Sequence, residues 1–226
     1  MIQLKNISRL YRSDEVETAA LSDIDLFIQR GEFVAIMGPS GCGKSTLLNI
    51  LGTIDRPSAG QYLFEDADLA KMNESKLAEF RSSHLGFIFQ SFNLIDDLTI
   101  RENIELGLQY RKGVNGSRRE LVDEAMDRVG VAHRARHYPH QLSGGQQQRA
   151  AIARAIVGSP KLLLADEPTG NLDTENGLQV MGILRALNQS GVTIAMVTHS
   201  PSQADLASRR VNILDGRLAL SVTRVM

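Results

Sequence analysis

The segment GPSGCGKS at residues 38–45 has the residue types and spacing of a loop that binds phosphate groups. Its three glycines let backbone N–H groups turn toward phosphate oxygens with no side chain in the way. Lys44 would neutralise the β- and γ-phosphates of a nucleotide, and the Ser45 hydroxyl would bind Mg²⁺. A buried strand before the loop and a helix after it are the context that supports this motif. The predicted nucleotide contacts are Gly38, Pro39, Ser40, Gly41, Cys42, Gly43, Lys44, Ser45 and Thr46.

Two adjacent carboxylates stand at the end of an apolar run, LLLAD, at residues 162–166. A buried parallel strand that ends in Asp166 and Glu167 would deliver both to the edge of a sheet where ligands bind. Asp166 would hold Mg²⁺, and Glu167 could polarise an attacking water as a general base. An acidic pair before Pro168 could also simply end the strand in a turn. The phosphate loop favours the catalytic interpretation.

A second glycine-containing motif, LSGGQ, lies at residues 142–146. Ser143 and two glycines come just before a helical pattern at 146–157, which indicates a second helix N-terminus suited to anions. The chain thus has two helix N-termini suited to anions but one strand that ends in an acidic pair. This combination suggests that the second start serves a nucleotide bound by another molecule.

These motifs require a scaffold of alternating strands and helices. Near-continuous apolar runs separated by helical patterns predict an α/β fold with a mainly parallel sheet covered on both faces. The expected core elements are strands at 33–37, 85–90, 162–166 and 192–199, and a helix at 44–54. Residues 1–30 and 211–222, with Asp215-Gly216 as a turn, predict antiparallel strand pairs.

The chain between Gln90 and Leu142 becomes polar and helix-rich, with a helix expected at 118–129. We interpret this stretch as a helical subdomain inserted into the α/β core. The prediction is therefore one domain over residues 1–226. Its core and antiparallel β subdomain occupy about 1–90 and 160–226, and its helical subdomain, which includes LSGGQ, occupies about 91–159.

Composition excludes several classes of protein. The 226 residues contain 25 Lys and Arg against 26 Asp and Glu, so the net charge of −1 argues against a strongly basic nucleic-acid binder. The single cysteine, Cys42, excludes an internal disulfide and suits a reducing compartment. The apolar runs are far shorter than the ~20 residues needed to cross a bilayer, and the N-terminus lacks a secretory signal. We expect a cytoplasmic chain that reaches a membrane only through a partner.

Taken together, the motifs resemble an ABC-type ATPase, the nucleotide-binding subunit of an ATP-binding-cassette system, over essentially the whole chain. The resemblance implies a P-loop NTPase core, ATP and Mg²⁺ as cofactors, and ATP hydrolysis. It implies that Asn171-Leu172-Asp173 crosses a dimer interface, and that two copies enclose ATP as a homodimer. It also implies a set of site residues: catalytic Lys44, Gln90, Glu167 and His199; nucleotide contacts from Tyr11 under adenine and from Ser143, Gly144, Gly145 and Gln146; and metal ligation by Ser45, Gln90 and Asp166.

The sequence departs from this family pattern at two positions. Cys42 stands where serine is common and could make the nucleotide site sensitive to thiol reagents. Ser200 follows His199 where aspartate is frequent, which leaves the implied role of the histidine intact.

Three segments resemble the subfamily of macrolide-efflux, lipoprotein-releasing and cell-division ATPases: residues 36–52, 85–106 and 138–156. This resemblance implies a chain bound to the cytoplasmic face of the membrane. Its partner would be an integral permease with a large extracytoplasmic domain, and through it a periplasmic adaptor. The ATPase would power export, lipoprotein release or mechanical signalling across the membrane. Residues 90–97, with apolar Phe92, Leu94 and Ile95, are expected to contact the permease.

The alternative is a soluble ABC-type ATPase in DNA maintenance or regulation, with no membrane partner. Such an ATPase would need a long coiled coil between Gln90 and the LSGGQ motif, where this chain has space only for a small subdomain. A translation factor with two cassettes would need a second phosphate loop. The sequence therefore favours the membrane complex, and no nucleic-acid partner is expected.

Overall fold

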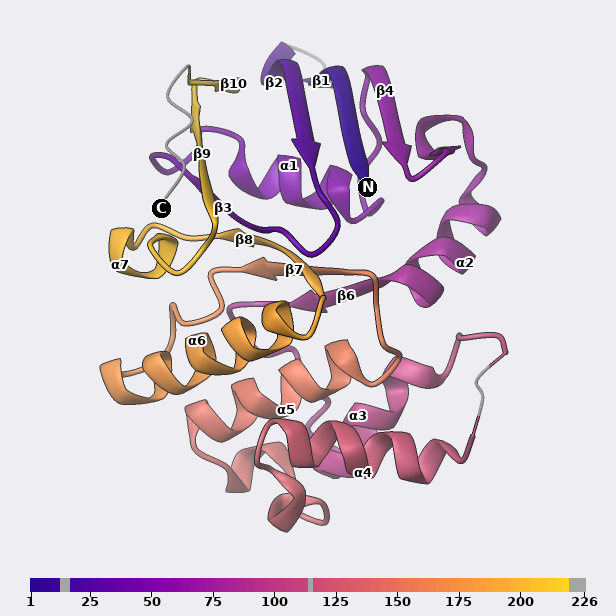
Figure 1. Cartoon of the computed structure of the whole chain (residues 1–226), viewed down its shortest axis with the longest axis vertical. Coiled ribbons are helices and arrows are strands. Elements are labelled where there is room, and N and C mark those ends of the chain that lie inside the picture. Colours follow the sequence, from indigo (N-terminus) through magenta and orange to yellow (C-terminus); the bar gives the residue numbers. More distant parts are fainter. Residues whose placement is uncertain (13–16, 114–115, 220–226) are drawn as a thin grey trace. The chain divides into compact units, whose positions relative to one another are not determined.

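The computed structural model describes residues 1–12, 17–113 and 116–219 (Figure 1). The chain forms two compact units. The first unit comprises residues 1–77 and 193–226, and the second unit comprises residues 78–192. Each unit contains its own strands and helices.

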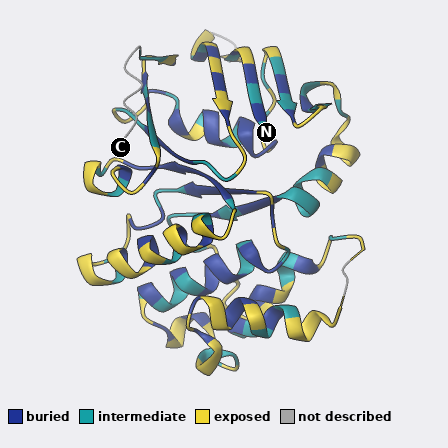
Figure 2. Ribbon diagram, in the orientation of Figure 1, coloured by how far each residue is buried: buried dark blue, intermediate teal, exposed yellow. Residues whose placement is uncertain are grey.

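The first unit contains an antiparallel sheet in the order β2-β1-β4-β5. Along β2, buried and exposed residues alternate, so one face of the strand is buried and the other faces solvent (Figure 2). In the register of β1 and β2, Leu4 pairs with Leu26 and Tyr11 with Thr18. The strands are β1 (Ile2–Arg12), β2 (Glu17–Ile28), β4 (Ala59–Phe64) and β5 (Ala67–Asp68).

The first unit also contains a buried parallel arrangement in which β3 (Phe33–Met37) pairs with β8 (Thr193–Val197) and β9 (Arg209–Leu214). Continuous burial along β3 and β8 is typical of strands covered on both faces. The helix α1 (Lys44–Leu51) packs against β8, and α7 (Pro201–Ala204) packs against β3. The remaining elements are β10 (Arg217–Leu218), antiparallel to β9, and the short helix η1 (Leu69–Lys71).

The second unit is built around the helix α5 (Gly144–Ile156), which packs against β6 and three other helices. Small side chains such as Ala150, Ala151 and Ala153 are fully buried and allow this close packing. The strands β6 (Leu85–Ile88) and β7 (Leu162–Asp166) form a parallel pair. The helices packed on α5 are α3 (Ile100–Glu105), α4 (Arg118–Arg128) and α6 (Thr174–Gln189), and short helices η2 (Leu106–Leu108), η3 (Ala132–Arg134) and η4 (Pro139–Gln141) join them. The helix α2 (Glu74–His84) spans the residue boundary between the units.

The elements agree closely with those expected from the sequence. The strand at 33–37 and the helix at 118–129 occur almost unchanged, and Asp215-Gly216 turns between β9 and β10. The helix expected at 44–54 ends at Leu51, because Gly52 is its C-cap. The strands β4 and β5 were not expected, and β4 adds to the predicted β1–β2 pair. In the described part of the chain, no helix is both long and apolar enough to cross a membrane.

Candidate functional site

The phosphate loop follows β3 and leads directly into α1, as the motif requires. Lys44 is buried, and its ammonium group donates hydrogen bonds to the carbonyl oxygens of Gly38 at 3.0 Å and Pro39 at 2.7 Å. Ser45 is exposed in the first turn of α1. These hydrogen bonds from Lys44 stabilise the loop and place a positive charge inside the glycine-rich turn.

Two glycines of the loop have no room for a side chain. A Cβ at Gly38 would lie 2.2 Å from the Ile213 carbonyl oxygen, and one at Gly43 would lie 2.5 Å from the Ala20 carbonyl oxygen. Gly43 also has φ of 105° and is the N-cap of α1, so no side chain caps that helix. The N–H groups of its first turn thus remain suited to an anion. These features fit phosphate binding.

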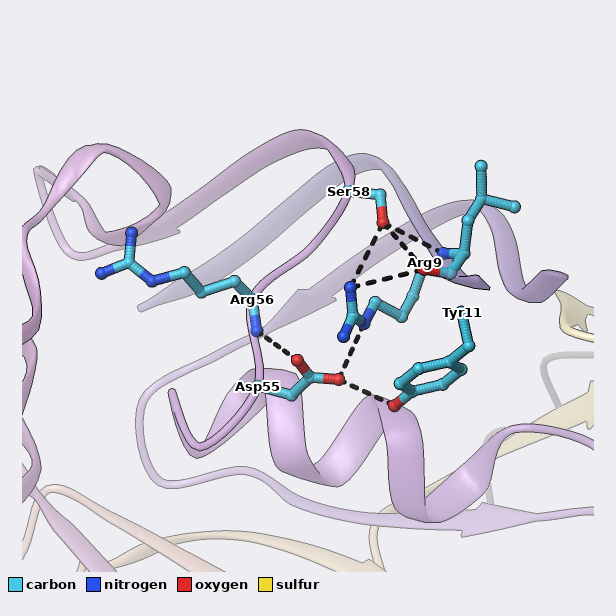
Figure 3. A network of polar contacts seen from close by, with 6 residues as sticks. Arg9, Tyr11, Asp55, Arg56 and Ser58 are labelled. Carbon is cyan, nitrogen blue, oxygen red and sulfur yellow. Dashed lines mark hydrogen bonds and ion pairs between the residues drawn. The ribbon is translucent and has the colours of Figure 1, made fainter. Parts of the chain in front are cut away.

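Tyr11 lies on β1 and is 41% exposed, and contacts with neighbouring side chains fix the orientation of its ring (Figure 3). Its hydroxyl donates a hydrogen bond of 2.7 Å to Asp55 Oδ2. The Arg9 guanidinium carbon lies 4.4 Å from the ring centroid, within cation–π range. Arg9 Nε donates to the same Asp55 oxygen at 2.8 Å, so the carboxylate joins both side chains.

Asp55 should contribute to stability in a pH-dependent way. Partial burial alone would raise its pKa, but hydrogen bonds from Tyr11, Arg9 and the Arg56 N–H outweigh burial and lower the pKa below its ordinary value. A group with a lowered folded-state pKa stabilises the fold above its unfolded pKa, and this contribution disappears as pH falls through the folded value. We expect the difference in unfolding free energy between wild type and Asp55→Asn to be constant from pH 5 to 8. Urea unfolding should show it shrinking below about pH 4, and a gap that grew in acid would contradict this.

The acidic pair lies at the end of β7, as expected. Asp166 is the last residue of the strand, Glu167 follows it, and both side chains are half-buried. Glu167 has φ of 44°, and its carbonyl oxygen accepts a hydrogen bond from the Gly170 N–H at 2.9 Å. A left-handed backbone at a residue that is neither glycine nor asparagine is costly and is concentrated at functional sites. The turn therefore fixes the backbone of the predicted base.

Gln90 and Asn171 form a reciprocal pair in the second unit. Gln90 Nε2 donates to Asn171 Oδ1 at 3.2 Å, and Asn171 Nδ2 donates to the Gln90 carbonyl oxygen at 3.1 Å. A Cβ at Gly170 would lie 2.6 Å from Gln90 Nε2, so glycine leaves the space that Gln90 fills. The structure thus brings together the glutamine after β6 and the segment predicted to cross a dimer interface.

Gln148 is a positioning residue that the sequence analysis did not identify. It is fully buried on α5, and its amide donates to the carbonyl oxygens of Pro168 at 2.6 Å and Phe89 at 3.3 Å. Among the described residues, its Oε1 has no hydrogen-bond partner. It links the ends of β6 and β7 to the helix of the LSGGQ motif. The sequence signal that could have identified it is a polar residue at a position on the buried face of that helix.

The LSGGQ motif starts α5 with a capping box. Ser143 is the N-cap, its hydroxyl accepts from the Gln146 N–H, and the Gln146 side chain accepts from the Ser143 N–H. A Cβ at Gly145 would lie 1.9 Å from Asn176 Oδ1, so only glycine fits there. The predicted helix start is present, two residues earlier than the periodicity indicated.

The loop after β6 has an unusual backbone. Phe92 and Asn93 both have left-handed conformations, with φ of 59° and 52°. Arg154, near the end of α5, donates to the carbonyl oxygens of Phe92 at 2.8 Å and Asn93 at 2.5 Å. This guanidinium holds the backbone of residues 92–93, which belong to the segment predicted to contact a permease. Ile95, in the same segment, is 46% exposed.

The predicted site residues are divided between the two units. The first unit contains Tyr11, the phosphate loop and His199, which is exposed two residues after β8. The second unit contains Gln90, the LSGGQ motif and the acidic pair. Each unit thus presents a distinct part of the predicted chemistry.

Comparison with known proteins gives a consistent result. A family model described as ABC transporter matches residues 21–170. An uncharacterized ABC transporter ATP-binding protein of Methanocaldococcus jannaschii is 49% identical over 218 residues, which cover 96% of this chain and 97% of that protein. A macrolide export ATP-binding/permease protein of Hahella chejuensis is 46% identical over 218 residues. These cover 96% of this chain but 33% of that longer protein.

Solved structures give the same answer for the fold. A dimeric ATP-binding cassette in a post-hydrolysis state, bound to ADP and Pi, has a TM-score of 0.92 and 39% identity. It covers 100% of this chain and 99% of its own. A second dimeric structure, of a bacterial ABC transporter cassette, has the same TM-score at 40% identity. The predicted fold class is therefore confirmed.

Proposed function

Because this chain belongs to the ABC transporter family of ATP-binding cassettes, we propose that it hydrolyses ATP to drive a separate membrane subunit. Membership makes it the nucleotide-binding component of a transporter and argues against a DNA-maintenance ATPase. The observation that carries the proposal is the presence of two helix starts suited to anions, at Lys44 and at Gly144, together with the acidic end of β7.

The residues have separate roles in the proposed reaction. The phosphate loop and Lys44 bind the phosphates, and Tyr11 stacks on the base. Glu167 accepts the proton of the attacking water, and Gln90 and His199 orient the water and the γ-phosphate. Phosphoryl transfer depends mainly on positioning and charge neutralisation, which the fixed loops described above support.

The donor set suits Mg²⁺. Hydroxyl, carboxylate and amide oxygens are the ligands that this ion prefers, and Ser45, Asp166 and Gln90 supply one of each. Ser45 is exposed at the start of α1, and Asp166 ends β7. When bound, the ion would neutralise charge on the phosphates.

We propose that two copies of the chain bind ATP between them, with Ser143, Gly144, Gly145 and Gln146 of one copy contacting the nucleotide held by the phosphate loop of the other. The dimeric cassettes of similar structure support this arrangement. Each γ-phosphate would add charge-assisted hydrogen bonds across the interface, and hydrolysis would remove them. ATP would thus favour the closed dimer, and ADP the open one.

The permease would dock on the second unit, beside the loop fixed by Arg154. A groove of about 300 Å³ is lined there by Phe87, Phe89, Asn93, Arg111 and Arg154, among others. The Phe87 and Phe89 rings are stacked with centroids 5.8 Å apart. Apolar rings beside two cations suit a short helix of the membrane subunit that carries apolar and acidic side chains. The chain would then lie on the cytoplasmic face of the membrane, and a periplasmic adaptor would join through the permease.

Capture of the partner tests the proposal. Tagged Glu167→Gln protein, incubated with ATP and detergent-solubilised native membranes, should retain an integral membrane protein with a large extracytoplasmic domain, identified by mass spectrometry. Retention of only soluble proteins or DNA would overturn the membrane-motor proposal. The shape of the captured domain would distinguish export, lipoprotein release and mechanical signalling.

A charge placed on the docking surface should prevent that capture. We expect Ile95→Glu to reduce recovery of the membrane protein at least tenfold, because burying an unpaired carboxylate against an apolar partner is unfavourable. The basal ATPase rate should not change, because the Ile95 side chain is exposed and the hydrogen bonds at this residue, with Asn103 and the Leu98 N–H, are made by its backbone. Leu178→Glu on α6 is the matched control, because Leu178 is also an exposed apolar residue of the second unit. Equal recovery with Ile95→Glu and Leu178→Glu would contradict the docking site.

A further inference from the structure

Tyr11 makes a contact through its ring and another through its hydroxyl group. The hydroxyl donates to Asp55, which lies four residues beyond the end of α1, and the Arg9 guanidinium covers the ring (Figure 3). Arg9 Nε also donates to Asp55, at 2.8 Å. The three side chains therefore form a closed set of contacts that fixes the plane of the ring.

Both carboxylate oxygens of Asp55 accept hydrogen bonds from neighbouring residues. Its Oδ2 accepts from Tyr11 and Arg9, and its Oδ1 accepts from the Arg56 N–H at 2.8 Å. Its side chain is only 21% exposed. The carboxylate thus holds Tyr11 and Arg9 in place, and its expected effect on a ligand is through them.

Arg9 is held as firmly as the ring that it covers. Besides its bond to Asp55, its guanidinium donates to the Leu10 carbonyl oxygen at 3.4 Å and to Ser58 Oγ at 3.5 Å. The Ser58 hydroxyl in turn accepts from the Leu10 N–H at 3.0 Å. These contacts tie the cation to the backbone of β1, so it stays over one face of the ring.

The strand β2, which pairs with β1 at Tyr11, connects this residue to the phosphate loop. In the register of β1 and β2, Tyr11 pairs with Thr18, and Leu10 pairs with Ala19. Ala20 follows Ala19 on β2, and its carbonyl oxygen is the atom that leaves no room for a Cβ at Gly43. The strand next to Tyr11 thus packs directly on the phosphate loop, within the same unit. A base stacked on the exposed ring would belong to a nucleotide whose phosphates reach that loop.

We propose that Arg9 and Asp55 are positioning residues of the base site: they fix the Tyr11 ring, with Arg9 on one face, so that the other face is presented to the purine of ATP. The inference rests on the proposed function, because it assumes a nucleotide on the phosphate loop. A ring fixed before binding loses little conformational freedom when the base stacks, so affinity for the base is gained without new contacts. The Arg9 charge keeps one face occupied and thereby defines the direction of stacking.

Calorimetric titration with two ligands tests this assignment. ADP carries the base and pyrophosphate does not, so the comparison separates the base site from the phosphate loop. We expect Tyr11→Phe, Asp55→Ala and Arg9→Met each to weaken ADP binding about three- to tenfold, as expected for one aromatic contact. Pyrophosphate binding should remain within twofold of wild type, and KM for ATP should rise while kcat is unchanged.

Two further measurements make the test specific. The Tyr11→Phe/Asp55→Ala double variant should bind ADP no more weakly than Asp55→Ala alone, because the hydroxyl acts only through the carboxylate. Tyr110→Phe is the matched control, since Tyr110 is 80% exposed and lies in the second unit, and it should not change either affinity. If Asp55→Ala does not fold, Tyr11→Phe alone still tests the hydrogen bond.

Three results would overturn the assignment. ADP affinity equal to wild type in all variants would show that the network does not support the base. Equal losses for ADP and pyrophosphate would show a structural role only. Wild-type protein that binds neither ligand would overturn the ATP proposal itself, and this inference with it.

Discussion

Glu167→Gln should lower the rate of ATP hydrolysis at least a hundredfold while ATP still binds. General-base catalysis contributes about 10²- to 10⁴-fold, and the amide cannot accept the proton of the attacking water. The substitution preserves size, so the left-handed turn at Glu167, with its Gly170 N–H bond, should be retained. Steady-state phosphate release and nucleotide titration measure the two effects.

The same variant should accumulate as an ATP-bound dimer, because the γ-phosphate contacts between copies would no longer be removed. Size-exclusion chromatography with light scattering should show the doubled mass with ATP but not with ADP. Glu124→Gln, at an exposed position of α4, is the matched control and should behave as wild type. A Glu167→Gln protein that hydrolysed ATP at the normal rate would show that another group is the base.

Gly145→Ala should be damaging for a different reason. The new methyl group would lie 1.9 Å from Asn176 Oδ1 and 2.9 Å from Asn176 Cβ, so the start of α5 or of α6 must move. Overpacking of this kind costs about 1–3 kcal/mol. Because the LSGGQ N–H groups would shift with the helix start, we expect the ATPase rate to fall at least tenfold. Urea unfolding and phosphate release measure both changes.

Gly182→Ala on α6 is the matched control for this substitution. Apart from its chain neighbours and the backbone of its own helix, no atom of the described residues lies within 4 Å of a Cβ built there, so alanine should be neutral or should stabilise the helix by up to about 1 kcal/mol. In an Asn176→Ala background, Gly145→Ala should cost less, because the closest conflicting atom is gone. An equal cost in both backgrounds would place the damage outside the Gly145–Asn176 contact.

The predictable features are those encoded within a few neighbouring residues. The phosphate loop was identifiable because Gly38 and Gly43 are required by local backbone geometry, and the buried strands because their apolar runs are continuous. The capping box at Ser143 was likewise contained in the spacing of Ser143 and Gln146. In each case one short segment contains both the signal and the structure that it specifies.

The unpredicted features depend on atoms far apart in the sequence. Asp55 holds Tyr11 across 44 positions, and Gln148 reaches the carbonyl oxygen of Phe89 across 59. Every residue has a backbone carbonyl oxygen, so the sequence does not indicate which of them accepts a side-chain hydrogen bond. The strands β4 and β5 were not predicted because their stability depends on pairing: β4, which begins with Ala59 and Gly60, pairs with β1, and β5 pairs with β4.

Side-chain hydrogen bonds stabilise both ends of the helix α5. Ser143 and Gln146 fasten its first turn, and Arg154, near its last turn, holds the backbone of Phe92 and Asn93. Thirteen residues of helix make a stiff rod about 20 Å long. We therefore expect a displacement of the loop at residues 92–93 to reach the LSGGQ end as a tilt of the whole helix. In the proposed complex, α5 would act as a lever that connects the loop proposed to contact the permease with the LSGGQ helix start.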